Sequence, residues 1–159
     1  MKELEYITDD TQYGIKITDD LIDNIISICD MSNRKETGGI LIGYYSSDQK
    51  WAHITLATRP TKDSKHSFCT FFRGVWGLMH LLDNEWEKNG CYYIGEWHYH
   101  PRALPIPSPK DIKQMMLFSR DLQLKCPEPI LLIVGGDSTG WSHSLHLIVQ
   151  NNVLNMQLK

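Results

Sequence analysis

Residues 97–111, with the sequence WHYHPRALPIPSPKD, constrain the fold more than any other part of the chain. They follow a run of aromatic and β-branched residues, CYYIGEWH, which favours a β-strand. Pro101 has no N–H to donate, so we expect the strand ladder to stop there. Ser108, Pro109 and Asp111 are typical of a helix start, as N-cap, first helical residue and third helical residue. The segment therefore predicts a strand, a stiff turn and a helix that returns beside the strand.

Three side chains of this segment are expected to meet at one point. Residues two apart on a strand point to the same face, so His98 and His100 aim together while Tyr99 faces away. Asp111, in the first turn of the returning helix, can approach them. Two imidazoles and one carboxylate form a three-ligand zinc set that leaves the fourth position for water. We therefore predict one Zn²⁺ per chain, bound by His98, His100 and Asp111.

Glu36, in the segment ETGGILIG, supplies a further carboxylate. A carboxylate that is close to the metal but is not a ligand can take a proton from the water, which makes Glu36 the candidate general base. Each feature alone has a simpler explanation. An isolated His-x-His on a strand is usually structural, Ser108 and Asp111 are compatible with a helix cap only, and Glu36 is compatible with a solvated charge. The order and spacing of the whole set favour a zinc hydrolase.

The same residues resemble the JAMM signature of the JAB/MPN metalloprotease family: a distant Glu, then H-x-H-P, six residues and S-x-x-D. ETGG followed by an apolar strand is similar to the prokaryotic JAB branch, and the resemblance covers residues 17–149. In that family the two His and the Asp bind zinc, which here implies His98, His100 and Asp111. The resemblance also implies that Glu36 is the general acid/base and that Ser108 helps to hold the oxyanion.

The resemblance implies a fold and a substrate class. The fold is α/β: a three-layer α/β/α JAB/MPN (cytidine-deaminase-like) domain with a mixed, curved central sheet, expected as a single domain over residues 1–159. The substrate is the amide or isopeptide bond after the C-terminal tail of ubiquitin or a ubiquitin-like protein. The short chain is similar to the deubiquitinase-like peptidases found with E1/E2-like conjugation enzymes in bacterial antiphage operons, notably CBASS. Tyr99 departs from the Ser or Thr of many deubiquitinating members, which affects substrate detail.

Other functions remain open at this point. A related peptidase could process a sulfur-carrier precursor to expose its C-terminal Gly-Gly. A catalytically silent MPN-type scaffold is a different class, but such relatives usually lack part of the metal site, which is complete here. Metal storage fits less well, since it favours closed coordination. For the substrate, the polar loop 60–67 and the proline-rich loop 101–107 are candidate walls of the groove. Leu104 and Ile106 either contact the partner or pack against the third helix.

Composition and charge indicate which partners and which cellular compartment to expect. The formal net charge is −3 and no basic stripe appears, which argues against nucleic acid as the main partner. No apolar run is long enough for a membrane span, and the acidic residues in MKELEYITDD lead us to expect no signal peptide there. The four cysteines lack a C-x-x-C pair and are expected to be reduced, which favours a cytoplasmic location. They are Cys29, Cys69, Cys91 and Cys126.

Periodicity and turn residues predict alternating strands and helices along the chain. Strands are expected over 13–18, 39–45, 51–58, 67–72, 91–98, 129–134 and 140–149. Helices are expected over 19–31, capped by Thr18, over 74–88, and over 109–124.

Overall fold

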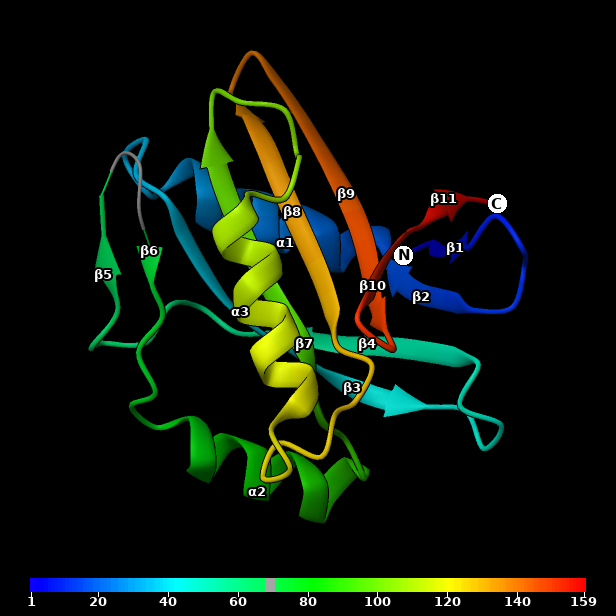
Figure 1. Cartoon of the computed structure of the whole chain (residues 1–159). Helices are drawn as coiled ribbons and strands as arrows, with labels where there is room; N and C mark the ends of the chain where they lie inside the picture. The colour runs from blue at the N-terminus through cyan, green and yellow to red at the C-terminus, as the bar shows by residue number, and fades with distance from the viewer. Residues whose placement is uncertain (68–70) are drawn as a thin grey trace.

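The computed structural model describes residues 1–67 and 71–159 (Figure 1). Within these residues the helices are α1 (Asp19–Asp30), α2 (Leu78–Asn89) and α3 (Pro109–Arg120). The strands, in chain order, are β1 (Glu3–Ile7), β2 (Gly14–Thr18), β3 (Thr37–Tyr45), β4 (Trp51–Ala57), β5 (Lys65–His66), β6 (Phe71–Phe72), β7 (Tyr92–Pro101), β8 (Ile130–Asp137), β9 (Gly140–Val149), β10 (Asn152–Asn155) and β11 (Gln157–Leu158).

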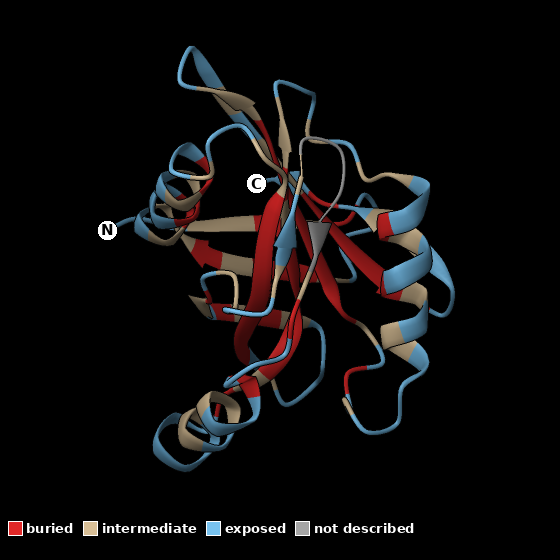
Figure 2. Ribbon diagram, turned by 90° about the vertical axis from the view of Figure 1, so that its left-hand side faces the viewer, coloured by how far each residue is buried: buried red, intermediate tan, exposed pale blue. Residues whose placement is uncertain are grey.

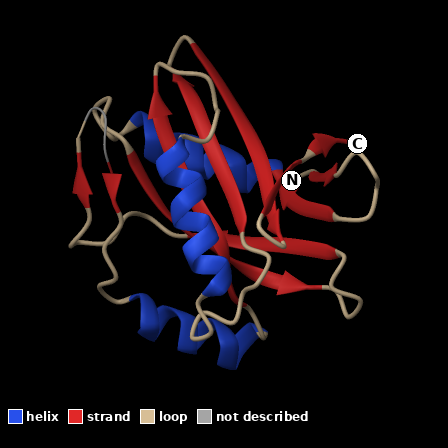
Figure 3. Cartoon of the chain, in the orientation of Figure 1, coloured by secondary structure: helices blue, strands red, loops and turns tan. Residues whose placement is uncertain are grey.

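A mixed sheet forms the centre of the molecule, with the strand order β10-β9-β8-β7-β3-β4-β2-β1-β11. β7 runs parallel to β8 and β2 runs parallel to β4, while the other neighbours are antiparallel. The pairing of β3 with β4 and with β7 contains register shifts, and such bulges bend a sheet. Figure 3 shows the curvature, since β3 and β4 run across the direction of β8 and β9. The expected mixed, curved sheet is confirmed.

The helices cover both faces of this sheet. On one face, Ile22 and Ile25 of α1 pack into a core that includes Trp97. On the other face, Leu78 of α2 and Met115 of α3 each pack into a separate apolar cluster. Figure 2 shows the buried residues, in red, along the strands between the helices. This is the expected α/β/α arrangement, and burial of each large apolar side chain contributes roughly 1.5–3 kcal/mol to it.

β7 lies between β3 and β8, near the middle of the sheet. Trp97 is fully buried on the α1 side, where its Nε1 donates to the Thr58 carbonyl at 2.9 Å. Tyr99 is in the same core and its hydroxyl donates to the Gly136 carbonyl. Because side chains alternate along a strand, His98 and His100 face the α3 side. Trp97 and Tyr99 therefore face away from the candidate ligands, as predicted.

The helix predicted from residue 74 begins later, at Leu78. The Asp63 carboxylate accepts hydrogen bonds from the backbone N–H groups of Val75 and Trp76, both at 3.0 Å, and these bonds hold the preceding residues in a turn. Gly77 follows with a φ of 75°, a left-handed conformation that glycine adopts without strain. A long-range contact from Asp63 therefore overrides the local helical pattern.

The other differences between the predicted and the observed elements concern where elements end and which short strands were not predicted. β7 continues to Pro101 rather than ending at residue 98, β8 continues to Asp137, and α3 ends at Arg120 rather than near residue 124. β1, β10 and β11 were not predicted, because all three are short and only Tyr6 of β1 is buried among their residues. The strand predicted over 67–72 includes residues 68–70, which lie outside the described residues.

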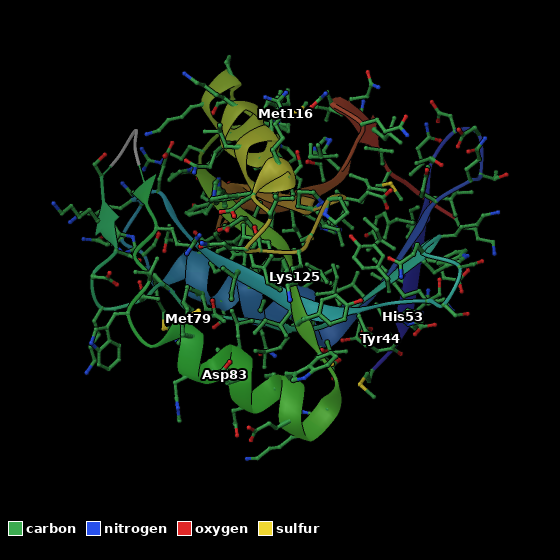
Figure 4. The ribbon with its side chains drawn as sticks, turned by 60° about the horizontal axis from the view of Figure 1, so that its bottom comes forward. Tyr44, His53, Met79, Asp83, Met116 and Lys125 are labelled. Carbon is green, nitrogen blue, oxygen red and sulfur yellow. The ribbon has the colours of Figure 1, made fainter. Side chains whose placement is uncertain are left out.

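Two sets of contacts hold neighbouring strands together, one at the β1 end of the sheet and one between β3 and β4. β1 pairs with both β2 and β11, and the Lys159 amide donates to the Glu5 carbonyl, so the chain ends share one edge (Figure 1). Tyr44 of β3 and His53 of β4 are register partners whose rings stack at 4.6 Å, as Figure 4 shows. Such cross-strand pairs stabilise the register of a sheet.

The expectation that the cysteines do not form disulfides is met by the three that the structure describes. Cys29, Cys91 and Cys126 are free and buried, while Cys69 lies outside the described residues. Among the helices of residues 1–67 and 71–159, none combines the length and the apolar character needed to cross a bilayer.

Candidate functional site

The end of β7 and the start of α3 bring the three predicted ligands into contact. Asp111 Oδ1 lies 2.8 Å from His98 Nδ1, and Asp111 Oδ2 lies 3.1 Å from His100 Nε2. All three side chains are largely shielded from solvent, with exposed fractions of 15% for each histidine and 10% for the aspartate. The three side chains therefore meet as predicted, because His98 and His100 share one face of β7 and α3 brings Asp111 back beside them.

Asp111 is held in place by the helix cap that the sequence indicated. The Ser108 Oγ accepts from the Asp111 amide at 3.1 Å, and the Asp111 Oδ2 accepts from the Ser108 amide at 2.7 Å. This reciprocal pair is a capping box, with Pro109 at the first helical position. The cap therefore holds the Asp111 carboxylate in the position where it contacts the two histidines.

The pKa shifts of Asp111 and His100 favour the charged form of both side chains. Burial alone would raise the pKa of Asp111, but hydrogen bonds from His100 and His98 hold that pKa well below its ordinary value. The same hydrogen bond, from His100 to the Asp111 carboxylate, raises the pKa of His100 against the opposing effect of burial. The backbone of Ile106 also acts to raise the pKa of His100. Binding of the second ring nitrogen to a backbone group is common for metal-ligating histidines, because it fixes the ring orientation.

Glu36 lies directly before β3, beside these residues. Its amide donates to the Ser67 carbonyl at 2.7 Å, and His66 Nδ1 lies 3.0 Å from its carbonyl oxygen. Burial raises the pKa of the Glu36 side chain, while the nearby His100 lowers it and Asp111 raises it. Since Thr37 is the register partner of Tyr99, residue 36 lies beside the end of β7 that carries the two histidines. A half-buried carboxylate with a raised pKa is a better proton acceptor than a solvated one.

The three candidate ligands have the chemistry that zinc requires. Two imidazoles and a carboxylate are ligands that zinc accepts, and all three come from rigid elements. Within residues 1–67 and 71–159, however, no three acidic, histidine or cysteine side chains surround a common point at metal-binding geometry. The three candidates instead hydrogen-bond to one another. The donor chemistry and the mutual contact of the three side chains fit a zinc ion, whose binding would replace these hydrogen bonds with metal–ligand bonds.

Sequence reasoning missed Glu96, which lies two residues before His98 and is fully buried. Its Oε1 accepts from the Tyr93 hydroxyl at 3.0 Å, and its Oε2 lies 2.6 Å from Arg73 Nε. The Arg73 contact is an ion pair without hydrogen-bond geometry, so Oε2 has no hydrogen-bond partner among the described residues. Burial raises the pKa of Glu96, and Arg73 lowers it. The period of two along β7 was the available signal, because it aligns Glu96 with both histidines.

The proline-rich loop 101–107 is anchored on the sheet beside the site. The Arg102 amide donates to the Gly136 carbonyl, and the Ser144 hydroxyl donates to the Pro105 carbonyl. Leu104 and Ile106 are 70% and 61% exposed. Packing against α3 therefore does not bury them, and contact of these two side chains with a partner stays a prediction.

Known proteins are similar to this chain over most of its length. Residues 18–147 match the family described as prokaryotic homologs of the JAB domain. A relative from Enterobacter hormaechei subsp. hoffmannii (strain UCI 50), named CD-NTase/cGAS isopeptidase, is 41% identical over 145 residues, which cover 91% of this chain and 79% of the relative. A relative of the same name from Escherichia coli (strain TW11681) is 30% identical over 110 residues, which cover 67% of this chain and 65% of the relative.

A solved structure also has a similar fold. The solution structure of protein DSY2949 from Desulfitobacterium hafniense matches with a TM-score of 0.60, over 89% of this chain and 87% of that chain. The sequences are 17% identical, so this likeness concerns the fold.

Proposed function

Because this chain belongs to the prokaryotic JAB family, we propose that it is an isopeptidase-type hydrolase that uses one Zn²⁺. One observation carries the proposal: His98, His100 and Asp111 contact one another on the face of β7 beside Glu36. The name shared by the two relatives, CD-NTase/cGAS isopeptidase, supports the hydrolase class.

The proposed roles are those that the family resemblance implies for these residues. His98, His100 and Asp111 would hold the metal, which when bound supplies a Lewis acid that activates water at neutral pH. Glu36 would accept the proton of that water on its carboxylate and later deliver it to the leaving amine. The Ser108 Oγ accepts the Asp111 amide, so its hydroxyl proton remains available to donate to the oxyanion.

We propose a protein conjugate as the substrate, with cleavage after the C-terminal tail of a ubiquitin-like protein. Such a tail is extended and would lie between the loops 60–67 and 101–107. E1/E2-like conjugation enzymes would be the partners, in a bacterial antiphage system in the cytoplasm. The names of the relatives favour a second candidate, in which a CD-NTase is part of the conjugate.

The test is cleavage of reporter fusions that carry a ubiquitin-like tail, a CD-NTase tail or a sulfur-carrier tail. Wild type, Glu36→Gln and chelator-treated protein would be compared, with zinc content measured in parallel. We expect cleavage at the tail by zinc-loaded wild type only, and Glu36→Gln should keep zinc but lose turnover. Glu128→Gln is a matched control, because Glu128 is also half-buried with a raised pKa but lies outside the site. Absence of both zinc and cleavage in wild type would instead support a silent scaffold.

A further inference from the structure

A surface pocket lies behind the candidate site. It has a volume of about 390 Å³ and is formed by the end of α1, the turn before β3 and the loop after β4. Lys35 and Thr37, the two neighbours of Glu36, both line it. Thr37 is the register partner of Tyr99, whose side chain lies in the core on the α1 side. The pocket therefore lies across the backbone of residue 36 from the His–Asp cluster.

The lining of this pocket combines apolar surface with positive charge. Ile28, Met31 and Pro60 supply the apolar part, and the Met31 residue is 61% exposed. Lys35 and Arg59 supply the charges, and the lining contains no Asp or Glu. Neither cation has an ion-pair partner among the described residues. Such a surface matches a group that has an apolar stem and a negative end.

The pocket is also connected to the backbone of the candidate base. His66 lines the pocket, and its Nδ1 lies 3.0 Å from the Glu36 carbonyl oxygen. An occupant would therefore contact Lys35, Thr37 and His66, which flank or hold Glu36. A site so close to the reacting residues is suited to a part of the substrate rather than to a remote effector.

We propose that this pocket binds an acidic segment of the protein substrate. Lys35 and Arg59 would pair with its carboxylates, while Ile28 and Met31 would cover an adjacent apolar side chain. The net charge of the whole chain is −3, so the attraction of an acidic segment to Lys35 and Arg59 is a local effect, which would fix where the segment binds. The proposal rests on the isopeptidase function and names one recognition element of its substrate.

Binding can be measured without turnover in the Glu36→Gln protein. Fluorescence anisotropy would use three labelled peptides of equal length and equal leucine content, in which the other residues are Glu, Gln or Lys. We expect the Glu peptide to bind about three- to tenfold more tightly than the Gln peptide, as partly exposed ion pairs allow. Arg59→Glu should abolish that preference and Arg59→Gln should reduce it. Lys50→Glu, in the exposed turn before β4, is the matched control and should leave the preference intact.

The outcomes separate this proposal from the proposed function. Equal binding of the three peptides, or a preference that survives Arg59→Glu in a protein with an unchanged melting temperature, would overturn it. Tight binding of inorganic phosphate with no peptide preference would overturn it in favour of a small anion. If the Glu preference depends on Arg59 but no fusion is cleaved by wild type, the pocket proposal holds and the isopeptidase function fails. If a fusion is cleaved, Arg59→Glu should raise the KM for that fusion about three- to tenfold. This factor should match the loss of peptide affinity measured for the same variant.

Discussion

Asp111 serves the helix and the candidate site with the same carboxylate. One oxygen contacts His98, and the other accepts from the Ser108 amide and contacts His100. A carboxylate with so many partners is well ordered before any metal arrives, which reduces the entropy lost on binding.

Removal of the Asp111 carboxylate should abolish both metal binding and turnover. For Asp111→Ala we expect less than one zinc per chain by elemental analysis and no tail cleavage. Loss of the capping interaction should also destabilise the fold by about 1 kcal/mol. Asp121→Ala, at the other end of α3, is the control and should keep zinc. Stoichiometric zinc in Asp111→Ala would exclude Asp111 as a ligand.

The Arg73–Glu96 ion pair should matter for stability. Removal of one partner of a buried pair leaves an uncompensated charge and costs about 3–5 kcal/mol, so Arg73→Ala should lower the free energy of unfolding by roughly that amount in urea titrations. Arg73→Leu combined with Glu96→Gln should recover part of the loss, because no buried charge remains. Lys16→Ala breaks exposed ion pairs with Glu3 and Glu5 and should change stability little. A change no larger than that of Lys16→Ala would show that Glu96 is already neutral in the fold.

At the scale of elements, α1 and α3 begin with comparable side-chain caps. Thr18 Oγ1 accepts from the Leu21 amide at 3.3 Å, and Ser108 Oγ accepts from the Asp111 amide at 3.1 Å. Only the second cap lies at the candidate site. The two helices therefore allow the structural and the chemical role of Ser108 to be separated.

Ser108→Ala and Thr18→Ala should have similar effects on stability but different effects on turnover. Each substitution should cost about 1 kcal/mol as a lost cap. Ser108→Ala should also lower kcat about 10²–10³-fold, as is typical when an oxyanion donor is lost. Chemical denaturation and steady-state cleavage would be measured on both variants. Equal kcat values in the two variants would assign Ser108 to capping alone.

Gly135 of β8 allows the loop 101–107 to lie on the sheet. A Cβ at this position would come within 2.3 Å of the Ala103 carbonyl oxygen. Gly135→Ala should therefore displace the loop and, through the Ile106 contact, the His100 ring, with a fall in kcat. The amide chemical shifts of residues 102–106 would report the displacement. Gly140→Ala, where a Cβ meets nothing within 4 Å, is the control and should leave both the shifts and kcat unchanged.

Local rules explain why much of the site could be read from sequence. Alternation along β7 places His98 and His100, and a capping pattern places Asp111 and Ser108. Glu36 required the family resemblance, because no local rule connects it with residues more than sixty positions away. The Arg73–Glu96 pair and the turn held by Asp63 depend on segments that meet only in the folded chain. Periodicity carries no signal for such contacts.

At the scale of the whole molecule, the proposed zinc would link metal binding to stability. A metal that binds the folded chain adds about 4 kcal/mol when its free concentration is a thousand times its dissociation constant. The melting temperature of wild type should therefore rise with added Zn²⁺ and fall with a chelator. Asp111→Asn keeps a capping oxygen but loses the charge, so its melting temperature should respond weakly. Equal responses of wild type and Asp111→Asn would place the bound zinc elsewhere.

The pairing of β1 with β11 has a consequence for how the chain can be rearranged. Both ends lie on one edge of the sheet, and Figure 1 shows them on the side opposite the β5–β6 hairpin. A short linker could join them, and new ends could be opened in the exposed turn between β3 and β4. Such a circular permutant should keep the fold and the His–Asp cluster intact, since the architecture depends on which strands are neighbours and not on where the polypeptide is cut.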